Sequence, residues 1–173
     1  MFCKRLKFEY FYSMVPGTNN KSLFVLIAVV SLFVVSCKQV DVFEKNTNIP
    51  GLKWQSNFAA TGTFNIEDTI SSYNLYLVLR HTDAYQYNNV WLNVGLQSPG
   101  DSLYFQKIDL SLGNDASGWE GTGMNDIWEV RKPLAQNKRF KKKGEYRFSI
   151  FHVMRDNPLL HIMSAGLRVE KAP

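Results

Sequence analysis

The residues with the clearest chemical potential are Ser36 and Cys37, which close an apolar run. Lys21 precedes 14 residues without charge, from Ser22 to Val35, and a small residue then stands directly before the cysteine. This three-part pattern is typical of a secretory signal. Lipoprotein signal peptidase cleaves between a small residue and a cysteine. We therefore predict that the mature chain begins at Cys37, with a diacylglyceryl group on its thiol and a fatty-acyl chain such as palmitate on its amine.

The apolar run is too short for a membrane-spanning helix, which is the alternative interpretation of this segment. Fourteen residues rise about 21 Å in a helix, against a hydrocarbon core of roughly 30 Å. Each buried methylene of an acyl chain contributes about 0.8 kcal/mol, so several chains hold a protein permanently at the membrane. We predict a tethered protein, and a start at Met1 or at Met14 gives the same mature chain.

Charge and cysteine content limit the partners and chemistry of the mature chain. Removing residues 1–36 takes away four of 20 basic and one of 15 acidic residues, which leaves a net charge of +2. Nothing in that balance predicts a nucleic-acid partner. Because Cys3 is removed and Cys37 is acylated, disulfides, thiol catalysis and cysteine-bound metals are excluded.

A basic cluster, residues 138–143, precedes Gly144 and is expected to form a solvated turn. A role against acidic lipid or polysaccharide is the alternative.

No group of residues has the spacing of a metal or catalytic site. His81, His152 and His161 are scattered, so we predict neither a metal nor a cofactor. Two of the loop carboxylates Asp83, Glu120 and Asp126 could in principle form a hydrolase pair, but carboxylates in loops are usual in any domain. We therefore predict no catalytic residues and a protein that is not an enzyme.

Two loops carry the densest groups of polar and aromatic side chains. The segment from Arg80 to Asn89 can serve recognition or form a structural corner, and Trp119 in Gly118–Gly123 can plug the core or serve as an exposed platform. From these loops we take a candidate partner-binding set: Arg80, His81, Asp83, Tyr85, Trp119 and Asp126.

These loops must be positioned by β-strands, because nearly every run alternates with period two. The pattern predicts strands at residues 61–66, 73–80, 90–96, 103–110, 127–130, 146–154 and 160–169. A helical pattern occurs only weakly, at residues 132–142. The prediction is an all-β protein with a single β-sandwich, jelly-roll or immunoglobulin-like, behind a lipoprotein signal peptide.

We divide the chain into the signal peptide, residues 1–36, a lipidated tether, residues 37–48, and the β-sandwich domain, residues 49–173. The apolar and acidic residues from Val40 to Glu44 indicate that the chain begins to join the folded body around Val42.

Together, these segments resemble the GldH-type gliding-motility lipoproteins of Bacteroidetes. The resemblance rests on Cys37 with its preceding small residue, on the run from Tyr73 through Arg80-His81-Thr82-Asp83 to Trp91, on Gly118–Ile127 and on Ala165–Lys171. It covers roughly Phe43 to Lys171.

The resemblance implies a lipid-anchored envelope protein of the gliding machinery, linked to type IX secretion, that contacts other envelope proteins of that system. It implies no catalytic activity. Because Lys38–Asp41 is only weakly acidic, we expect an outer-membrane anchor that faces the periplasm. Thr69 and Ser102 lie in short patterns that resemble O-glycosylation acceptors of this phylum.

The alternative function is a carbohydrate-binding envelope lipoprotein that holds polysaccharide on Trp119, Trp91 or Tyr85. Exposed aromatic rings that face one another would favour it.

Overall fold

A computed structural model describes residues 42–173 of the chain, in which the regular secondary structure is β-strand apart from one 3₁₀ turn. The signal peptide, Cys37 and the first part of the tether lie outside the described residues. Among residues 42–173, no helix has the length and apolar character needed to cross a membrane.

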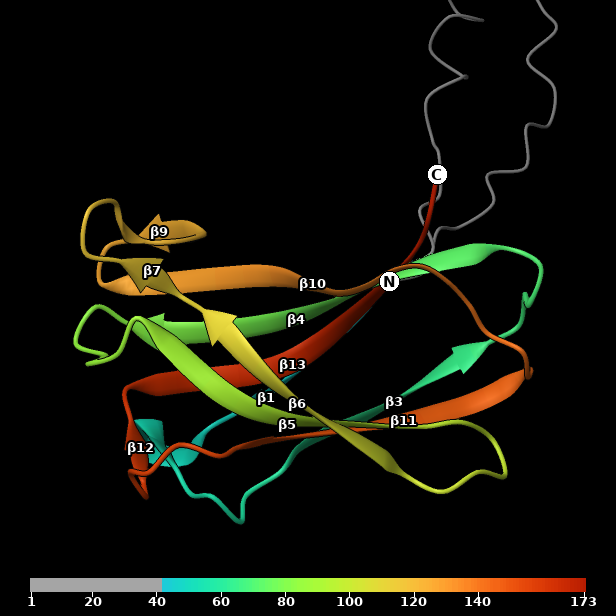
Figure 1. The fold of residues 1–173 in the computed structure, drawn as a ribbon, viewed down its shortest axis with the longest axis horizontal. Coiled ribbons are helices and arrows are strands. Elements are labelled where there is room, and N and C mark those ends of the chain that lie inside the picture. The colour runs from blue at the N-terminus through green and yellow to red at the C-terminus, as the bar shows by residue number, and fades with distance from the viewer. Residues whose placement is uncertain (1–41) are drawn as a thin grey trace, which may run out of the picture. The chain divides into compact units, whose positions relative to one another are not determined.

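Two antiparallel sheets form the body of the domain, and Figure 1 shows them as two layers. The five-stranded sheet has the order β1 (Val42–Asn48), β13 (Ile162–Lys171), β4 (Ser72–Thr82), β10 (Ile127–Arg139) and β9 (Thr122–Met124). The four-stranded sheet has the order β3 (Ala60–Ile66), β11 (Gly144–His152), β5 (Asn89–Gln97) and β6 (Tyr104–Ser111). Smaller elements are the 3₁₀ turn η1 (Pro50–Leu52) and the pairs β2 (Lys53–Trp54) with β12 (Leu159–Leu160) and β7 (Gly113–Asn114) with β8 (Gly118–Trp119).

The eight long strands pair in a nested order. The first, β1, pairs with the last, β13; within them β3 pairs with β11, β4 with β10, and β5 with β6. A long hairpin folded over itself gives this order, which is that of a jelly roll. The predicted β-sandwich is therefore confirmed, and the topology selects the jelly roll over the immunoglobulin-like alternative.

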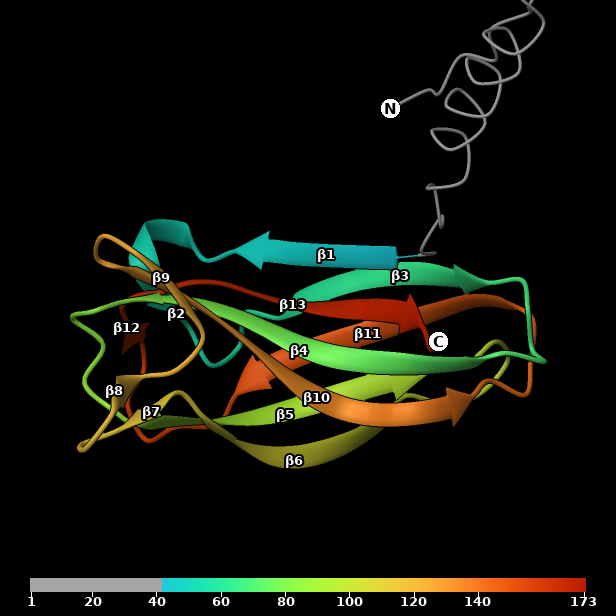
Figure 2. The ribbon, with the colours of Figure 1, turned by 90° about the horizontal axis from the view of Figure 1, so that it is seen from above.

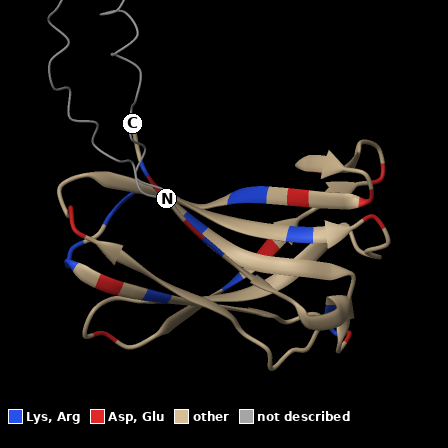
Figure 3. Cartoon of the chain, turned by 180° about the vertical axis from the view of Figure 1, so that it is seen from behind, with Lys and Arg blue, Asp and Glu red and all other residues tan. Residues whose placement is uncertain are grey.

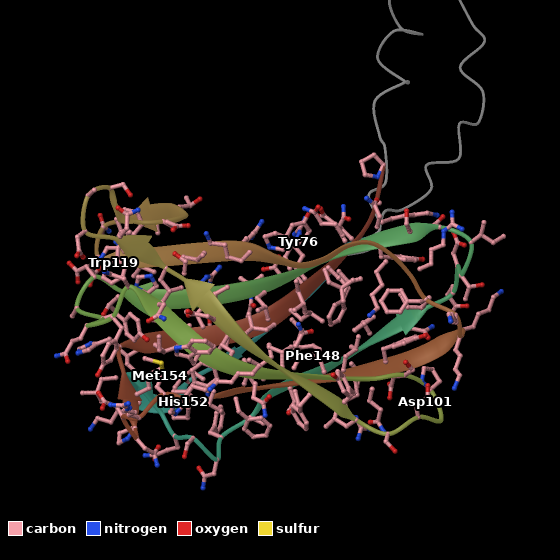
Figure 4. All side chains as sticks on the ribbon, viewed as in Figure 1. Tyr76, Asp101, Trp119, Phe148, His152 and Met154 are labelled. Atoms are coloured by element: carbon pink, nitrogen blue, oxygen red, sulfur yellow. The ribbon has the colours of Figure 1, made fainter. Side chains whose placement is uncertain are left out.

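Alternate side chains of both sheets fill the space between the layers, as period two requires. Leu75, Leu77 and Leu79 of β4 are buried, and Tyr146 and Phe148 of β11 are buried as well. Figure 4 shows Phe148 between the two layers. Each large apolar side chain removed from water contributes about 1.5–3 kcal/mol, so this layer carries most of the stability.

Aromatic clusters seal the two ends of the sandwich, and Figures 1 and 2 show these ends on opposite sides of the domain. At the end formed by the β3–β4, β5–β6 and β10–β11 loops, the ring of buried Phe140 lies 4.7 Å from Tyr146, 5.4 Å from Tyr73 and 5.8 Å from Phe64. We call this the Phe140 end. At the opposite end, which carries β7, β8 and β9, Trp119 packs against His81, 4.6 Å between ring centroids. We call that the Trp119 end.

One predicted boundary needs correction. The tether was predicted to extend to residue 48, but residues 42–48 form β1, paired along its whole length with β13, so the folded body includes the chain from Val42, near which the sequence also indicated its start. This polar strand lies at the edge of its sheet, so its sequence lacks the apolar alternation of a buried strand. The weak helical pattern at residues 132–142 does not correspond to a helix, because β10 continues to Arg139.

The irregular pattern in β10 has a local cause. The strand shifts register between Pro133 and Ala135 and again between Ala135 and Lys138, and Asn137 has a φ of 51°. Such bulges add residues to one strand and interrupt the alternation that identifies a strand in a sequence. In the basic cluster, Lys138 and Arg139 therefore end β10, and the turn comprises residues 140–143.

The pairing of β1 depends on Gly166 of β13, which gives a first prediction. A Cβ atom at Gly166 would lie 2.2 Å from the Lys45 carbonyl oxygen and 2.2 Å from Asn46 Oδ1, so Gly166→Ala must displace β1. We expect it to lower the free energy of unfolding by at least about 2 kcal/mol in chemical denaturation.

Gly100→Ala is the matched control. Its Cβ would meet no atom within 4 Å, but its φ is +76°, so we expect a cost of about 1 kcal/mol. Equal losses in the two variants would show that β1 is not closely packed on β13.

Candidate functional site

The six residues of the candidate partner-binding set lie together at the Trp119 end. Arg80 and His81 end β4, Asp83 and Tyr85 lie in the following loop, Trp119 lies in β8, and Asp126 lies in the β9–β10 turn. The backbone N–H of Asp83 donates a hydrogen bond of 2.8 Å to the carbonyl oxygen of Asp126, which joins the two loops. Residues far apart in the sequence are thereby brought to one end of the sandwich.

Three of the six seal the core at this end. His81 and Tyr85 are buried, Trp119 is partly buried, and the His81 ring lies 4.6 Å from Trp119 and 5.6 Å from Tyr85. The Tyr85 hydroxyl donates to the carbonyl oxygen of Asn89, 3.0 Å away. Of the two interpretations of Trp119, the core plug therefore describes its position, and Arg80, Asp83 and Asp126 remain at the surface.

Burial also sets the protonation of this cluster. It lowers the pKa of His81, because the charged imidazolium is poorly solvated there, although the hydrogen bond with the Thr82 carbonyl oxygen opposes the shift. It raises the pKa of the Tyr85 hydroxyl. Both side chains are thus neutral at pH 7.

A groove of about 580 Å³ lies beside this cluster, on the outer face of the five-stranded sheet. It is lined by charged, polar and apolar residues of strands β4, β9, β10 and β13 and of the β8–β9 loop: Arg80, Gly121, Thr122, Met124, Ile127, Glu129, Arg131 and Met163. Met124 is 71% exposed, which is unusual for a large apolar side chain.

Three ionised groups form the floor of the groove. Glu129 lies between Arg80, at 2.6 Å, and Arg131, at 2.9 Å. Both arginine side chains are 47% exposed, whereas Glu129 is only 18% exposed, so the guanidinium groups cover the carboxylate and the surface is positive. Figure 3 shows the basic and acidic positions following one another along β10.

The ion pairs continue across the same face to the edge of the sheet. Arg131 lies 3.6 Å from Glu44 of β1, and Glu44 lies 3.0 Å from Arg168 of β13. Burial opposes ionisation of Glu44, but hydrogen bonds from Arg168 and Asn46 and the charge of Arg131 outweigh it and lower its pKa. The groove floor is thus connected to β1 by charged side chains.

The hydrolase alternative finds no support in the protonation state of Glu120. Lys132 and the Ser111 hydroxyl donate to this carboxylate and hold its pKa below the usual range. A glycosidase general acid needs a raised pKa instead. Among residues 42–173, no three His, Cys, Asp or Glu side chains are grouped as a metal site.

Several residues that line the groove were not identified as site residues from the sequence. For those in β10, the alternation of buried and exposed positions could have identified them. Side chains of a strand alternate between its two faces, and Val130 is buried. Ile127, Glu129 and Arg131 therefore share the outer face of the sheet. Met163 lies at a register shift between Ile162 and Ser164, so period two does not place it.

A second surface lies on the outer face of the four-stranded sheet. Trp91 is 37% exposed, and the rings of Phe105 and Phe151 lie 6.0 Å apart above Gly95. The Lys107 ammonium group lies 4.7 Å from the Trp91 ring centre. These side chains form an exposed aromatic cluster, which we call the Trp91 cluster.

The chain is similar to proteins that have been described before. The family model described as GldH lipoprotein matches residues 41–169. The chain is 25% identical to a gliding motility lipoprotein GldH homolog of Christiangramia forsetii, over 87% of this chain and 96% of that protein. It is 26% identical to the gliding motility lipoprotein GldH of Flavobacterium johnsoniae, over 85% of this chain and 94% of that protein.

Among solved structures, a chain of infectious bursal disease virus, Gx strain, matches 77% of this chain and 32% of its own length. The TM-score is 0.37 and the identity 10%, and likeness of that degree carries no functional inference.

The buried histidines predict a loss of stability in acid. Burial lowers the pKa of His81 and, at the other side of the core beside Trp54, of His152 (Figure 4). The unfolded chain binds these protons near pH 6.5, so stability is complete above about pH 6.5 and falls as the pH drops toward the folded-state values. We expect the free energy of unfolding, measured by chemical denaturation, to be lower at pH 5 than at pH 7.5.

Replacing both rings, in His81→Phe/His152→Phe, should flatten this pH dependence whatever its effect on stability at pH 7.5. His161→Asn, which removes a ring outside the core, should leave the dependence in place. An unchanged slope in the double variant would contradict the assignment.

Proposed function

The chain belongs to the GldH lipoprotein family, and we propose that it is a lipid-anchored accessory component of the gliding motility machinery that is linked to type IX secretion. The observation that carries the proposal is the match of the family over residues 41–169, together with two relatives named as gliding motility lipoproteins that align over nearly their whole length. The domain would act through contacts with other envelope proteins of this system.

The lipid anchor would sit on Cys37, and we propose the outer membrane, with the domain facing the periplasm. A signal segment followed by a small residue and cysteine supports the anchor. The periplasmic side is proposed because Lys38–Asp41 contains only one acidic residue.

We propose the groove at the Trp119 end as the contact surface. Arginine and methionine are enriched at protein interfaces, and the groove combines two half-exposed arginines with Met124, Ile127 and Met163. Most of these side chains project from paired strands, which hold them in fixed positions. Arg80, Asp83 and Asp126 of the predicted set border the same region.

Binding rather than catalysis is proposed as the activity. The ion pair with Lys132 favours the ionised form of Glu120, so this residue suits a structural or binding role. No cofactor or metal enters the proposal.

Deleting the gene and complementing it tests the function. We expect colony spreading to be lost, to return with the wild-type gene, and to stay absent with Cys37→Ala, because that chain lacks an anchor. Immunoblots must show that both proteins accumulate. Unaffected spreading in the deletion strain would contradict the proposed role in gliding motility.

Two further alleles test the groove in the same assay. Met124→Asp places a charge at an exposed groove position and should reduce spreading, whereas Val153→Asp places the same charge on an exposed residue outside the groove and should not. Equal behaviour of the two alleles at equal protein levels would argue against the groove as the contact surface.

Carbohydrate binding is the second candidate function, and the Trp91 cluster favours it. Trp119 and Tyr85 are largely removed from the surface, so this alternative depends on Trp91 with Phe105 and Phe151. Sugar rings stack on exposed aromatic faces, and loss of one such contact costs about tenfold in affinity.

The test is affinity electrophoresis in gels that contain the cell's extracellular polysaccharide. If the chain binds this polysaccharide, its migration is retarded, and we expect Trp91→Ala to lower the affinity derived from that retardation by about tenfold. Tyr104→Ala removes an exposed aromatic ring outside the cluster and is the control. Equal migration of the wild-type chain with and without polysaccharide would exclude this function for that polysaccharide.

A further inference from the structure

The chain enters the sandwich at the Phe140 end. Val42 begins β1 and pairs with Glu170 near the end of β13, Lys171 pairs with Tyr73 at the start of β4, and Arg139 at the end of β10 pairs with Ser72. The first described residue therefore belongs to the same end as the β3–β4 and β10–β11 loops, as Figure 2 shows for those loops.

The length of the chain before Val42 limits how far this end can lie from an anchor on Cys37. Val42 is the fifth residue after Cys37, and five residue steps span at most roughly 18 Å when the chain is fully extended. An acylated Cys37 lies at the membrane surface, so the start of β1 must stay within that distance of it.

The same end presents exposed positive charge. Lys138, Arg139, Lys141, Lys142 and Lys143 are all exposed at the end of β10 and in the following turn. Of these five, only Lys142 has an ion pair among residues 42–173, with Asp101 of the β5–β6 loop at 2.7 Å. Buried Phe140 holds this basic turn against the core.

A large apolar side chain is presented beside the basic turn. Ile70, in the β3–β4 loop, is 86% exposed. Asp68 fixes the loop, because its carboxylate accepts hydrogen bonds from the backbone N–H groups of Ile70 and Ser71 and from Lys171 Nζ, at 2.8, 3.1 and 2.8 Å. These interactions, with the Lys171 contact as the largest cause, hold the pKa of Asp68 well below its usual range.

We propose that the Phe140 end docks on the anionic phospholipid surface of the membrane that holds the anchor, with the basic turn on the headgroups and Ile70 inserted between them. The inference rests on the lipid anchor of the proposed function. Clusters of Lys and Arg close to an anchor bind anionic lipid, and an exposed aliphatic side chain adds apolar contact.

Docking in this way would orient the whole domain. The Trp119 end lies opposite the Phe140 end (Figure 1), so the groove with Arg80 and Arg131 would face away from the lipid. One end would thus meet the membrane and leave the other open to a protein partner. A glycan on Thr69 or Ser102, both in loops at the Phe140 end, would block this arrangement.

The test uses the mature lipidated chain in vesicles. Because Cys37 is acylated and no other cysteine follows it, Ile70→Cys and Thr122→Cys each provide a single thiol for an apolar fluorophore. The vesicles contain phosphatidylcholine with or without phosphatidylglycerol, and a trace of doxyl-labelled lipid as quencher. We expect strong quenching at position 70 in vesicles with phosphatidylglycerol, weaker quenching without it, and none at position 122 at the Trp119 end.

Two double variants, each of which removes two positive charges, distinguish an effect of the basic turn from an effect of net charge. Lys141→Gln/Lys143→Gln should lower the ratio of docked to undocked chains roughly fivefold for each charge removed. Lys53→Gln/Arg155→Gln removes two exposed charges elsewhere and should not change the ratio.

Equal quenching at positions 70 and 122, quenching that ignores phosphatidylglycerol, or equal effects of the two double variants would overturn the docking. Retention of the chain by an acidic polysaccharide through Lys141 and Lys143, with position 70 unquenched, would overturn it in favour of a glycan partner. A mature chain with unmodified Cys37, seen by mass spectrometry, would overturn anchor and docking together. Unaffected spreading in the deletion strain would remove only the gliding role.

Discussion

The pairing of β1 with β13 is the contact on which the remaining structure depends. In the nested order all the other long strands lie between these two in the sequence, and the pairing of β1 with β13 brings the two ends of the domain's chain together at one edge of the five-stranded sheet. Residues 42–173 contain no cysteine, so no covalent bond closes this order. The absence of a side chain at Gly166 is what lets the β1 backbone approach β13, and the buried layer around Phe148 supplies the driving force.

Closing the sandwich in this way leaves two open ends, and each is sealed by rings. Phe140 packs on Tyr73 and Tyr146 at one end, and His81 packs on Trp119 at the other. Because these rings pack against the core, the backbone segments that carry them are held in place, and so are the backbone positions of the exposed residues next to them. The same packing therefore positions the basic turn at one end and the groove at the other.

Period two revealed the strands whose one face is buried, and for that reason the strands around Leu77, Val94 and Phe148 were predicted from the sequence. Period two did not identify strands in which apolar and polar residues do not alternate. β1 is an edge strand with mostly polar residues, and β10 loses its alternation at the bulges near Pro133 and Asn137. The fold brings the candidate set together at the Trp119 end, but a sequence does not show that the Glu129 carboxylate lies beneath two arginines. Period two places Arg131 on the same face of β10 as Glu129, but Arg80 comes from β4, which is distant in the chain and is brought beside Glu129 only by the pairing of β4 with β10.

The charged row on the outer face connects these parts. Ion pairs that are this exposed contribute about 0–1 kcal/mol each to the free energy of folding. Their main effect is therefore to hold the charged side chains in place rather than to stabilise the fold. The row runs from Glu44 in β1 to Arg131 and Glu129 in β10 and on to Arg80 in β4. Because Glu44 lies in β1, a displacement of β1 would move Glu44 away from Arg131 and change the charge on the groove floor. Among the described strands, β1 is also the one nearest to Cys37 in the chain. The strand that closes the fold therefore also joins the chain leading to the predicted anchor with the surface proposed for the partner.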